Sequence, residues 1–317
     1  TWVADTNPNR LAKVADRYPG LRTTDDAVAA LSADDVDAVV IASPTSTHFG
    51  LARHALASGK HVLVEKPLTA DVGEGQELCA IASDQGVTLM VGHVFLYNQG
   101  VERVKHYLDQ GELGNVYYLS MTRTNLGPIR TDVNAAWDLA AHDISIANYW
   151  MGSGPEAVSA TGASWINPGL EDAVFATLRY PGGVLAHLHA SWLNPRKSRD
   201  ITVVGERRML TLDDMNLLEP IRIYDKGVAG SPDAGFVDTF ASFRASVREG
   251  DITIPPVSLG EPLSAECDHF IACILSGETP RTDGGFGLQV VRTLAAMEGS
   301  LRNGGREETL RSTQGAR

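Results

Sequence analysis

The residues best suited to chemistry lie in two short stretches. Glu65, Lys66 and Pro67 end the apolar run HVLV, so two opposite charges and a rigid ring stand where a buried strand would leave the core. Further along, Asp138 and His142 are four residues apart in a segment with helical periodicity, which places both on one face of a helix. A carboxylate beside an imidazole suits general acid/base chemistry near neutral pH. An isolated pair of this kind is more often an ordinary surface pair, and only its combination with Glu65-Lys66-Pro67 favours a catalytic site.

The first part of the chain must position these groups through a parallel sheet. Short apolar runs alternate with helical segments up to about residue 123, a pattern typical of a parallel sheet with both faces covered. Ligands of such sheets bind outside the carboxyl ends of the strands. The predicted strands are 37–43, 61–65 and 88–93, and the predicted helices are 7–18, 46–58, 71–85 and 99–110. The residues at the strand ends are Asp5, Ser43, Pro44, Thr45, Glu65, Lys66, Pro67 and His93.

Asp5 has two interpretations of equal weight. An acidic residue that ends the second strand of a dinucleotide fold binds the adenosine ribose and follows a glycine-rich fingerprint by about 20 residues. Alternatively, Asp5 only caps the next helix. Nothing in front of Asp5 can hold the fingerprint, so we expect the first strand and glycine loop to be absent from the chain as given.

The second part of the chain predicts a different kind of sheet. Alternating apolar and polar residues at hairpin spacing favour a mostly antiparallel sheet. One helix, over 136–150, is embedded in it, two more close the chain, and the polar tail is expected to fray. The expected strands are 115–124, 173–180, 183–192, 200–206 and 208–214, and the closing helices are 261–276 and 287–302. We therefore predict two domains, 1–96 and 97–317.

Composition narrows the class of protein. With 27 basic and 39 acidic residues among 317, the net charge is −12, which argues against nucleic acid and anionic membranes as partners. Cys79, Cys267 and Cys273 form no CxxC pair, which predicts reduced thiols in a cytoplasmic protein and no metal site. No apolar run is long enough to span a membrane.

Taken together, the motifs resemble those of the glucose–fructose oxidoreductase/inositol 2-dehydrogenase (Gfo/Idh/MocA) family. The resemblance covers nearly the whole chain, and the ordered set is specific although each piece alone is weak. Its residues are Ser43-Pro44 with His48, Glu65-Lys66-Pro67, Gly92-His93, Asp138 with His142-Asp143, and Ser191-Trp192. The resemblance implies an α/β Rossmann-like domain, here truncated at its start, followed by an α+β domain with an open, mostly antiparallel sheet.

The resemblance also implies roles for individual residues. Lys66 would stabilise the oxygen of the reacting carbinol, and its peptide bond to Pro67 is commonly cis in the family. His142 would exchange the proton of the carbinol, and Asp138 would bind a substrate hydroxyl and tune His142. The remaining predicted cofactor contacts are Asp5, Ser43, Pro44, Thr45, His48, Glu65 and Pro67, and the remaining predicted substrate contacts are His93 and Asn98.

Several assignments stay open at this stage. Asp5 favours NAD over NADP, whereas the nearby Arg10 leaves NADP possible. For His93, a packed histidine and a substrate contact are interpretations of equal weight. For Trp192, packing against the sheet is favoured over a role as a platform for a sugar ring. His187 and His189 share a strand face without a third metal ligand. Arg196, Lys197 and Arg199 are by default a solvated cluster and alternatively contact a phosphate-bearing substrate.

The predicted function is NAD(P)-dependent hydride transfer at a secondary hydroxyl of a sugar-like substrate, with a nucleotide sugar as the first candidate. Free sugars or inositols are the second. Further alternatives are a silent fold remnant that binds no cofactor and a decarbonylating or eliminating variant of the same fold. The apolar faces of 173–180 and 183–192 predict a homodimer or homotetramer that pairs through the second sheet.

Overall fold

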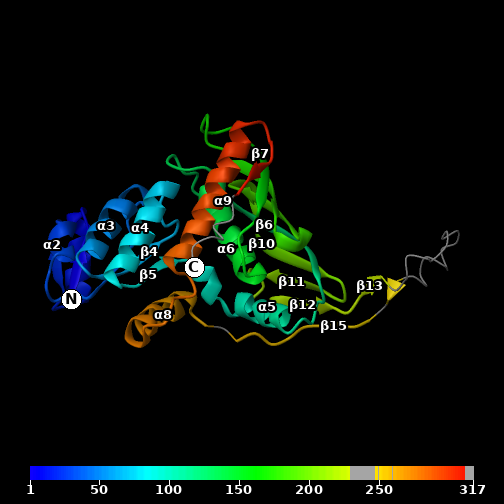
Figure 1. The fold of residues 1–317 in the computed structure, drawn as a ribbon, viewed down its shortest axis with the longest axis horizontal. Coiled ribbons are helices and arrows are strands. Elements are labelled where there is room, and N and C mark those ends of the chain that lie inside the picture. Colours follow the sequence, from blue (N-terminus) through cyan, green and yellow to red (C-terminus); the bar gives the residue numbers. More distant parts are fainter. Residues whose placement is uncertain (229–246, 249, 259, 311–317) are drawn as a thin grey trace. The chain divides into compact units, whose positions relative to one another are not determined.

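The computed structural model describes residues 1–228, 247–248, 250–258 and 260–310 (Figure 1). Contacts between residues divide the chain into two compact units. Unit 1 comprises Thr1–His93 and Leu263–Ala295, and unit 2 comprises Val94–Pro262 and Ala296–Arg317. The first boundary lies close to the one predicted, but the chain also returns to unit 1 after residue 262. The division into a cofactor domain and a substrate domain stays a prediction.

Unit 1 contains the predicted parallel sheet, in the order β3-β4-β5. Its strands are β3 (Ala38–Ile41), β4 (His61–Glu65) and β5 (Leu89–Gly92). A separate parallel pair consists of β1 (Trp2–Ala4) and β2 (Arg22–Thr24). The helices are α1 (Pro8–Arg17), α2 (Ala27–Leu31), α3 (His48–Ala57) and α4 (Val72–Gln85), with a 3₁₀ turn at Thr45–Thr47. The sequence analysis did not identify β2 and α2, which are short and largely exposed.

Local sequence explains the sharp ends of these elements. Val62, Leu63 and Val64 of β4 are buried, as expected of a strand covered on both faces. The following helix, α4, begins where the Asp71 carboxylate accepts a hydrogen bond from the backbone N–H of Glu74, at 3.0 Å. It ends at Gly86, whose φ of 64° lies in the left-handed region that favours glycine. The polar residues after β4 therefore lie between two rigid elements.

Unit 2 contains a nine-stranded sheet in the order β15-β12-β11-β10-β6-β9-β8-β7-β16. Its pairings are antiparallel except for the central pair β6–β9, so the predicted mostly antiparallel sheet is confirmed. Its strands are β6 (Val116–Leu126), β7 (Ala157–Ala163), β8 (Ala173–Arg179), β9 (Leu185–Ser191), β10 (Leu193–Gly205), β11 (Met209–Asp213), β12 (Ile221–Tyr224), β15 (Ile252–Thr253) and β16 (Glu308–Thr309). The short strands β13 (Gly227–Val228) and β14 (Val247–Arg248) pair separately.

Helices complete both units. In unit 2, α5 (Gln99–Asp109) follows a 3₁₀ turn at Val94–Tyr97, and α6 (Ala141–Met151) follows a π-helical turn at Ala136–Ala140. The closing helices are α8 (Pro262–Ser276) and α9 (Gly284–Arg302), and a further 3₁₀ turn spans Pro181–Gly183. None of the helices among the described residues is long and apolar enough to cross a membrane.

The polar tail differs from its prediction. Glu308 and Thr309 pair with β7 instead of fraying, because β7 offers a free edge and the Ser300 hydroxyl donates a hydrogen bond to the Arg306 carbonyl, at 2.6 Å. The last residues of the predicted frayed segment, 311–317, lie outside the described residues.

Candidate active site

Asp5 lies directly after β1 and does not cap α1. The cap is Asn7, whose side chain accepts hydrogen bonds from the backbone N–H groups of Asn9 and Arg10. The Asp5 carboxylate instead accepts from the N–H of Asn7 at 2.8 Å and pairs with Arg10 at 3.4 Å. With 28% of its side chain exposed, Asp5 keeps a carboxylate at a strand end, where a ribose hydroxyl can reach it. This favours the first of its two interpretations.

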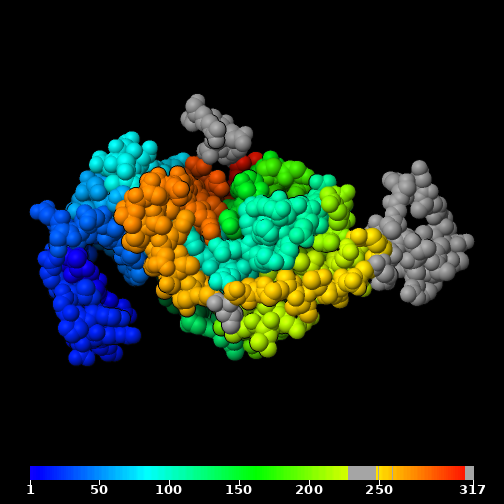
Figure 2. All heavy atoms as spheres, turned by 90° about the horizontal axis from the view of Figure 1, so that it is seen from below, coloured from blue at the N-terminus to red at the C-terminus, as the bar shows by residue number. Residues whose placement is uncertain are grey.

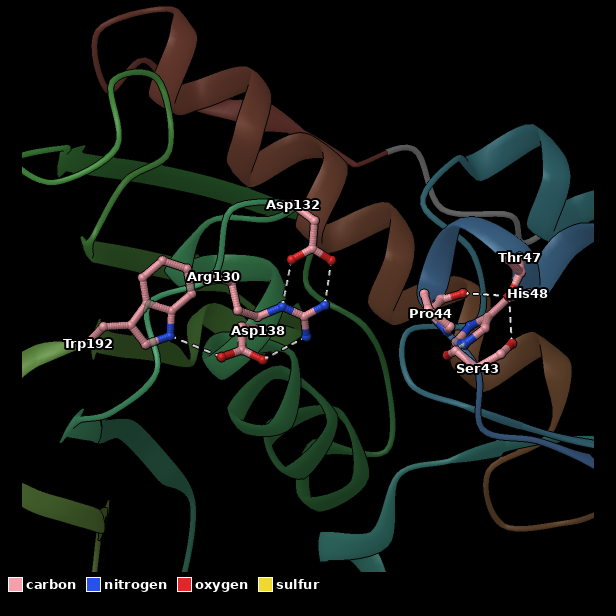
Figure 3. A network of polar contacts seen from close by, with 8 residues as sticks. All are labelled: Ser43, Pro44, Thr47, His48, Arg130, Asp132, Asp138 and Trp192. Carbon is pink, nitrogen blue, oxygen red and sulfur yellow. Dashed lines mark hydrogen bonds and ion pairs between the residues drawn. The ribbon is translucent and has the colours of Figure 1, made fainter. Parts of the chain in front are cut away.

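The loop after β3 is held by internal hydrogen bonds (Figure 3). The Ser43 and Thr47 hydroxyls are 2.6 Å apart, and Thr47 also donates to the Pro44 carbonyl at 2.8 Å. The buried His48 ring lies within hydrogen-bond distance of the carbonyl oxygens of Ser43 (3.0 Å) and Pro67 (2.9 Å). His48 therefore ties the loop after β3 to the loop after β4. Its direct contact with a cofactor, and that of Thr45 in the same turn, stay predictions.

The end of β4 carries the residues that opened the sequence analysis. The Lys66–Pro67 peptide bond is cis, as the resemblance implied. The Glu65 carboxylate accepts a hydrogen bond from the Lys66 N–H at 3.2 Å and lies against Gly92, its register partner on β5. A Cβ at residue 92 would lie only 3.2 Å from the Cα and the carboxyl of Glu65. Glycine at this position therefore leaves room for Glu65 at the edge of the sheet.

His93 is a buried neutral residue next to Lys66. Burial, together with the smaller effect of the positive charge of Lys66, lowers its pKa to about 3. Neither ring nitrogen has a hydrogen-bond partner within the described residues, and the ring meets Phe286 edge-on at 5.6 Å between centroids. His93 is therefore packed, as one of its two interpretations predicted, and its unsatisfied nitrogens remain available to a ligand. Because it stays neutral, it adds no second positive charge beside Lys66.

A second buried ionisable group near β4 was not identified from the sequence. Glu266 of α8 is buried, and both its carboxylate oxygens lack a partner among the described residues. Burial, together with the smaller effect of the negative charge of Glu65, raises its pKa to about 8. Glu266, Phe270 and Cys273 follow the i, i+4, i+7 spacing of a buried helix face. The acidic residue at a position of this apolar face was the feature of the sequence that could have identified Glu266.

In unit 2, Asp138 is held by two other side chains (Figure 3). The Trp192 indole N–H donates to one carboxylate oxygen at 3.0 Å, and an Arg130 nitrogen lies 3.4 Å from the other. Arg130 is itself fixed by two hydrogen bonds to Asp132, at 2.9 and 2.6 Å. Asp138 lies in the π-helical turn that precedes α6, a feature often found at functional sites. Trp192 is buried, which confirms its predicted packing role, and it also orients Asp138.

His142 lies in the first turn of α6, and the next residue, Asp143, belongs to a buried ion pair. Its ring meets Phe95 edge-on, with centroids 4.8 Å apart. Asp143, the next residue, accepts hydrogen bonds from two nitrogens of Arg123 at 2.8 and 2.9 Å, and Arg123 lies over the Phe95 ring at 4.4 Å. Burial raises the pKa of Asp143, and the charge of Arg123 opposes that shift. Phe95 and Arg123 are functional candidates that the sequence analysis missed, although Arg123 continues the inward register of Leu119 and Met121.

The remaining candidates have structural partners. Asn98 caps α5 by accepting from the N–H of Gly100 at 2.8 Å, and it donates to Asp214 at 3.0 Å, so its contact with a substrate stays a prediction. The predicted absence of a metal site stays a prediction, and among the described residues no three potential ligands gather. His189 stacks on Phe175, and Arg199 pairs with Asp214. Arg196 and Lys197 are exposed.

The parallel sheet of unit 1, with polar residues at its strand ends, and the mostly antiparallel sheet of unit 2 form the arrangement of a Rossmann-type dehydrogenase. The model of the oxidoreductase family with an NAD-binding Rossmann fold matches residues 1–93, and the model of the GFO/IDH/MocA C-terminal domain matches residues 101–211. The chain belongs to the Gfo/Idh/MocA family, as its motifs indicated. It is an NAD(P)-dependent oxidoreductase that acts on CH–OH groups.

Three comparisons illustrate the range of its relatives. UDP-N-acetylglucosamine 3-dehydrogenase of Acidithiobacillus ferrooxidans is 29% identical over 295 residues, which are 91% of this chain and 85% of that protein. Inositol 2-dehydrogenase 2 of Paenarthrobacter aurescens is 32% identical over 231 residues, 69% of this chain and 68% of that protein. A solved structure of the Acidithiobacillus enzyme matches with a TM-score of 0.79 and 27% identity, over 95% of this chain and 89% of that one.

Proposed function

We propose that the chain transfers hydride between a nicotinamide coenzyme and a secondary hydroxyl or ketone of a sugar-like substrate, with a nucleotide sugar as the first candidate. The observation that supports this most directly is Lys66, which follows β4 at the edge where such sheets bind their ligands. The relative that acts on UDP-N-acetylglucosamine, similar along most of the chain, favours a nucleotide sugar.

The residues of unit 1 fit a nicotinamide dinucleotide. Asp5 offers a partly exposed carboxylate to ribose hydroxyls, and Gly92 leaves open the place that a Cβ would fill next to Glu65. The unsatisfied nitrogens of the neutral His93 offer further hydrogen bonds beside Lys66. Ser43, Pro44 and Thr45 would line the phosphates and ribose. Arg10, paired with Asp5, could compensate the 2′-phosphate of NADP.

Each side chain has a separate role in the proposed reaction. The bound nicotinamide supplies the hydride acceptor or donor. Lys66 would place its ammonium at the carbinol oxygen and stabilise the negative charge that develops there. His142 would take the carbinol proton during oxidation and return it during reduction. Asp138, held by Trp192 and Arg130, would bind a neighbouring substrate hydroxyl in a fixed orientation.

The substitution Lys66→Met, made in the natural protein, tests this function. It should lower kcat for sugar oxidation by at least ~10²-fold, because the charge that stabilises the transition state is lost. The matched control is Lys60→Met, immediately before the opposite end of β4, where the ammonium donates to the Ala33 carbonyl. Turnover of the Lys66 variant equal to that of the Lys60 variant would remove the proposed role.

An inositol or free sugar is the second candidate substrate, favoured by the similarity to inositol 2-dehydrogenase 2 and to scyllo-inositol 2-dehydrogenase of Bacillus subtilis. A screen of UDP- and dTDP-sugars against inositols, read by the absorbance of reduced nicotinamide, separates the two. Calorimetric titration with NADH tests the alternative of a silent fold remnant, because a chain of that kind would not bind NADH.

We also propose that two copies pair through the open face of the unit 2 sheet. Tyr118, Phe175 and Leu185 are exposed on this face of β6, β8 and β9. An apolar face of this kind is commonly covered by a partner. Light scattering should then give at least twice the mass of one chain, and the mass of a single chain would contradict the pairing.

A further inference from the structure

Unit 2 contains a cavity whose ligand the proposed function does not specify, although one of its lining residues, Asn98, is a predicted substrate contact. Its volume is about 360 Å³, and Phe95, Asn98, Arg199, Asp214, Leu217 and Val257 are among the residues that line it. Small-molecule sites commonly have volumes of about 300–1,000 Å³. The cavity therefore has room for a single ring-sized group.

Three segments that are distant in the sequence form the walls. Phe95 and Asn98 come from the turn before α5, Asp214 and Leu217 come from the loop between β11 and β12, and residues 257, 258 and 260–262 supply the third wall. Figure 2 shows the yellow to orange segment before residue 259 lying along the turquoise α5. The same arrangement places Val257 and Ser258 against Gln99 of that helix. The cavity is thus built by tertiary contacts within unit 2.

The polar side of the cavity is fixed in advance. Asp214 accepts hydrogen bonds on both carboxylate oxygens, from Asn98 at 3.0 Å and from Arg199 at 2.9 Å. The Arg199 guanidinium lies over the Phe95 ring, 5.2 Å from its centroid. Three side chains with donor and acceptor capacity therefore have defined positions before any ligand enters, which lowers the entropy cost of binding.

Charge and polarity select the kind of ligand. Among the lining residues, the single arginine, Arg199, is paired with the carboxylate of Asp214 at 2.9 Å. An anion gains little in such a site, because the charge of the arginine is already compensated by Asp214. By contrast, amide and hydroxyl groups both donate hydrogen bonds to ligand hydroxyl groups and accept hydrogen bonds from them, and carboxylates accept such bonds. Apolar side chains, Leu217 among them, pack against the carbon face of a ring.

The cavity also has a defined relation to the proposed acid/base. Phe95 lines the cavity and meets the His142 ring edge-on at 4.8 Å between centroids. A substrate ring at His142 and a second ring in the cavity are therefore separated by about the width of one aromatic side chain. A two-ring substrate can occupy both places, whereas a single cyclitol fills only one.

We propose that this cavity binds the second, neutral, hydroxyl-bearing ring of a two-part substrate whose first ring is oxidised at His142. The second ring is either the ribose of a nucleoside or another sugar residue. This inference rests on the proposed function and sharpens it, because it favours conjugated sugars over inositols and free sugars.

The substitution Leu217→Trp tests the inference by filling the cavity. Leu217 is 65% exposed at the rim, so the larger side chain costs little folding free energy. The matched control is Leu218→Trp on the same loop, where the side chain is 92% exposed and does not line the cavity. Circular dichroism and urea unfolding verify that both variants are folded. The substrates are UDP-N-acetylglucosamine and a disaccharide, each compared with its free sugar.

Leu217→Trp should raise KM for the conjugated substrate by about tenfold or more and leave its kcat unchanged, since only binding of the second ring is lost. KM and kcat for the free sugar should stay at the wild-type values. Leu218→Trp should change KM and kcat for neither the conjugated substrate nor the free sugar. The conjugate whose KM responds, the nucleotide or the disaccharide, identifies the source of the ring. Equal behaviour of the two variants, or a wild type that uses free sugars as efficiently as conjugates, overturns the inference.

Equilibrium binding separates this inference from the proposed function. If no sugar is oxidised, the proposed function fails, yet calorimetry with the same conjugates still reports on the cavity. Weaker binding to Leu217→Trp than to Leu218→Trp supports the site. Binding of no conjugate to the wild type, or equal binding to both variants, refutes it.

Discussion

The buried ion pair of Arg123 and Asp143 yields the sharpest prediction for stability. The side chains of Arg123 and Asp143 are 6% and 3% exposed, and two nitrogens of Arg123 bond one oxygen of Asp143. Arg123→Met keeps the bulk of the side chain but leaves the carboxylate buried without its counter-charge. The substitution is therefore expected to destabilise unit 2.

The magnitude follows from burial. Removing one partner of a buried pair costs about 3–5 kcal/mol of unfolding free energy, because the remaining charge stays desolvated. The double variant Arg123→Met/Asp143→Leu removes both charges and should be more stable than either single variant by at least about 2 kcal/mol. The matched control is Arg208→Met, which breaks the partly exposed pairs with Glu112 and Asp225 and should cost about 1 kcal/mol or less.

Urea unfolding followed by tryptophan fluorescence measures these differences, since Trp137, Trp150 and Trp192 all lie in unit 2. The loss of unfolding free energy caused by Arg123→Met should also become smaller as the pH falls from 8 to 5. Burial raises the pKa of Asp143, and without Arg123 only the weaker effect of the Arg199 charge opposes that shift, so the carboxyl takes up a proton as the solution becomes acidic. A loss no larger than that of Arg208→Met, or a double variant no more stable than Arg123→Met, would refute the reasoning.

Two further predictions concern Glu266 and Asp138. The folded protein holds the Glu266 proton with a pKa of about 8 instead of 4.5, so this group makes stability fall as the pH rises between those values. Glu266→Gln should therefore unfold at higher urea than the wild type at pH 8.5, by at least about 1 kcal/mol, with little difference at pH 4; parallel stability curves would contradict this. Trp192→Phe removes the hydrogen bond to the Asp138 carboxylate and should cost about 2 kcal/mol or more in urea unfolding. It should also shift the pH profile of kcat, an effect that packing alone does not produce, and an unchanged profile would exclude the orienting role of Trp192.

Local patterns in the sequence were sufficient for the main elements. The apolar run before Glu65 and the alternation over 173–180 and 183–192 depend on burial, which acts on each segment with a fixed period. Those elements agree with their predictions to within a few residues. Short exposed elements such as β2 and α2 were missed, because too few apolar residues define a period there.

Charged residues in apolar registers marked sites that the sequence analysis did not use. Arg123 continues the inward face of β6, and Glu266 occupies the buried face of α8. Each position is visible in the sequence as a break in a hydrophobic pattern. The sequence does not show which residues lie near them. Asp143 lies beside Arg123, and Glu65 lies near Glu266, only because separate elements pack together.

The sequence by itself determined the two kinds of sheet, the family and the candidate residues at the strand ends, since these depend on local periodicity and on motifs of adjacent residues. Only the tertiary structure decided which side chains interact. Asp138 is held by Trp192 and Arg130, and the cavity beside Phe95 is lined by three segments far apart in the chain. The physical reason is range: hydrogen bonds and cavity walls require contacts of a few ångströms, and the fold alone brings distant residues that close.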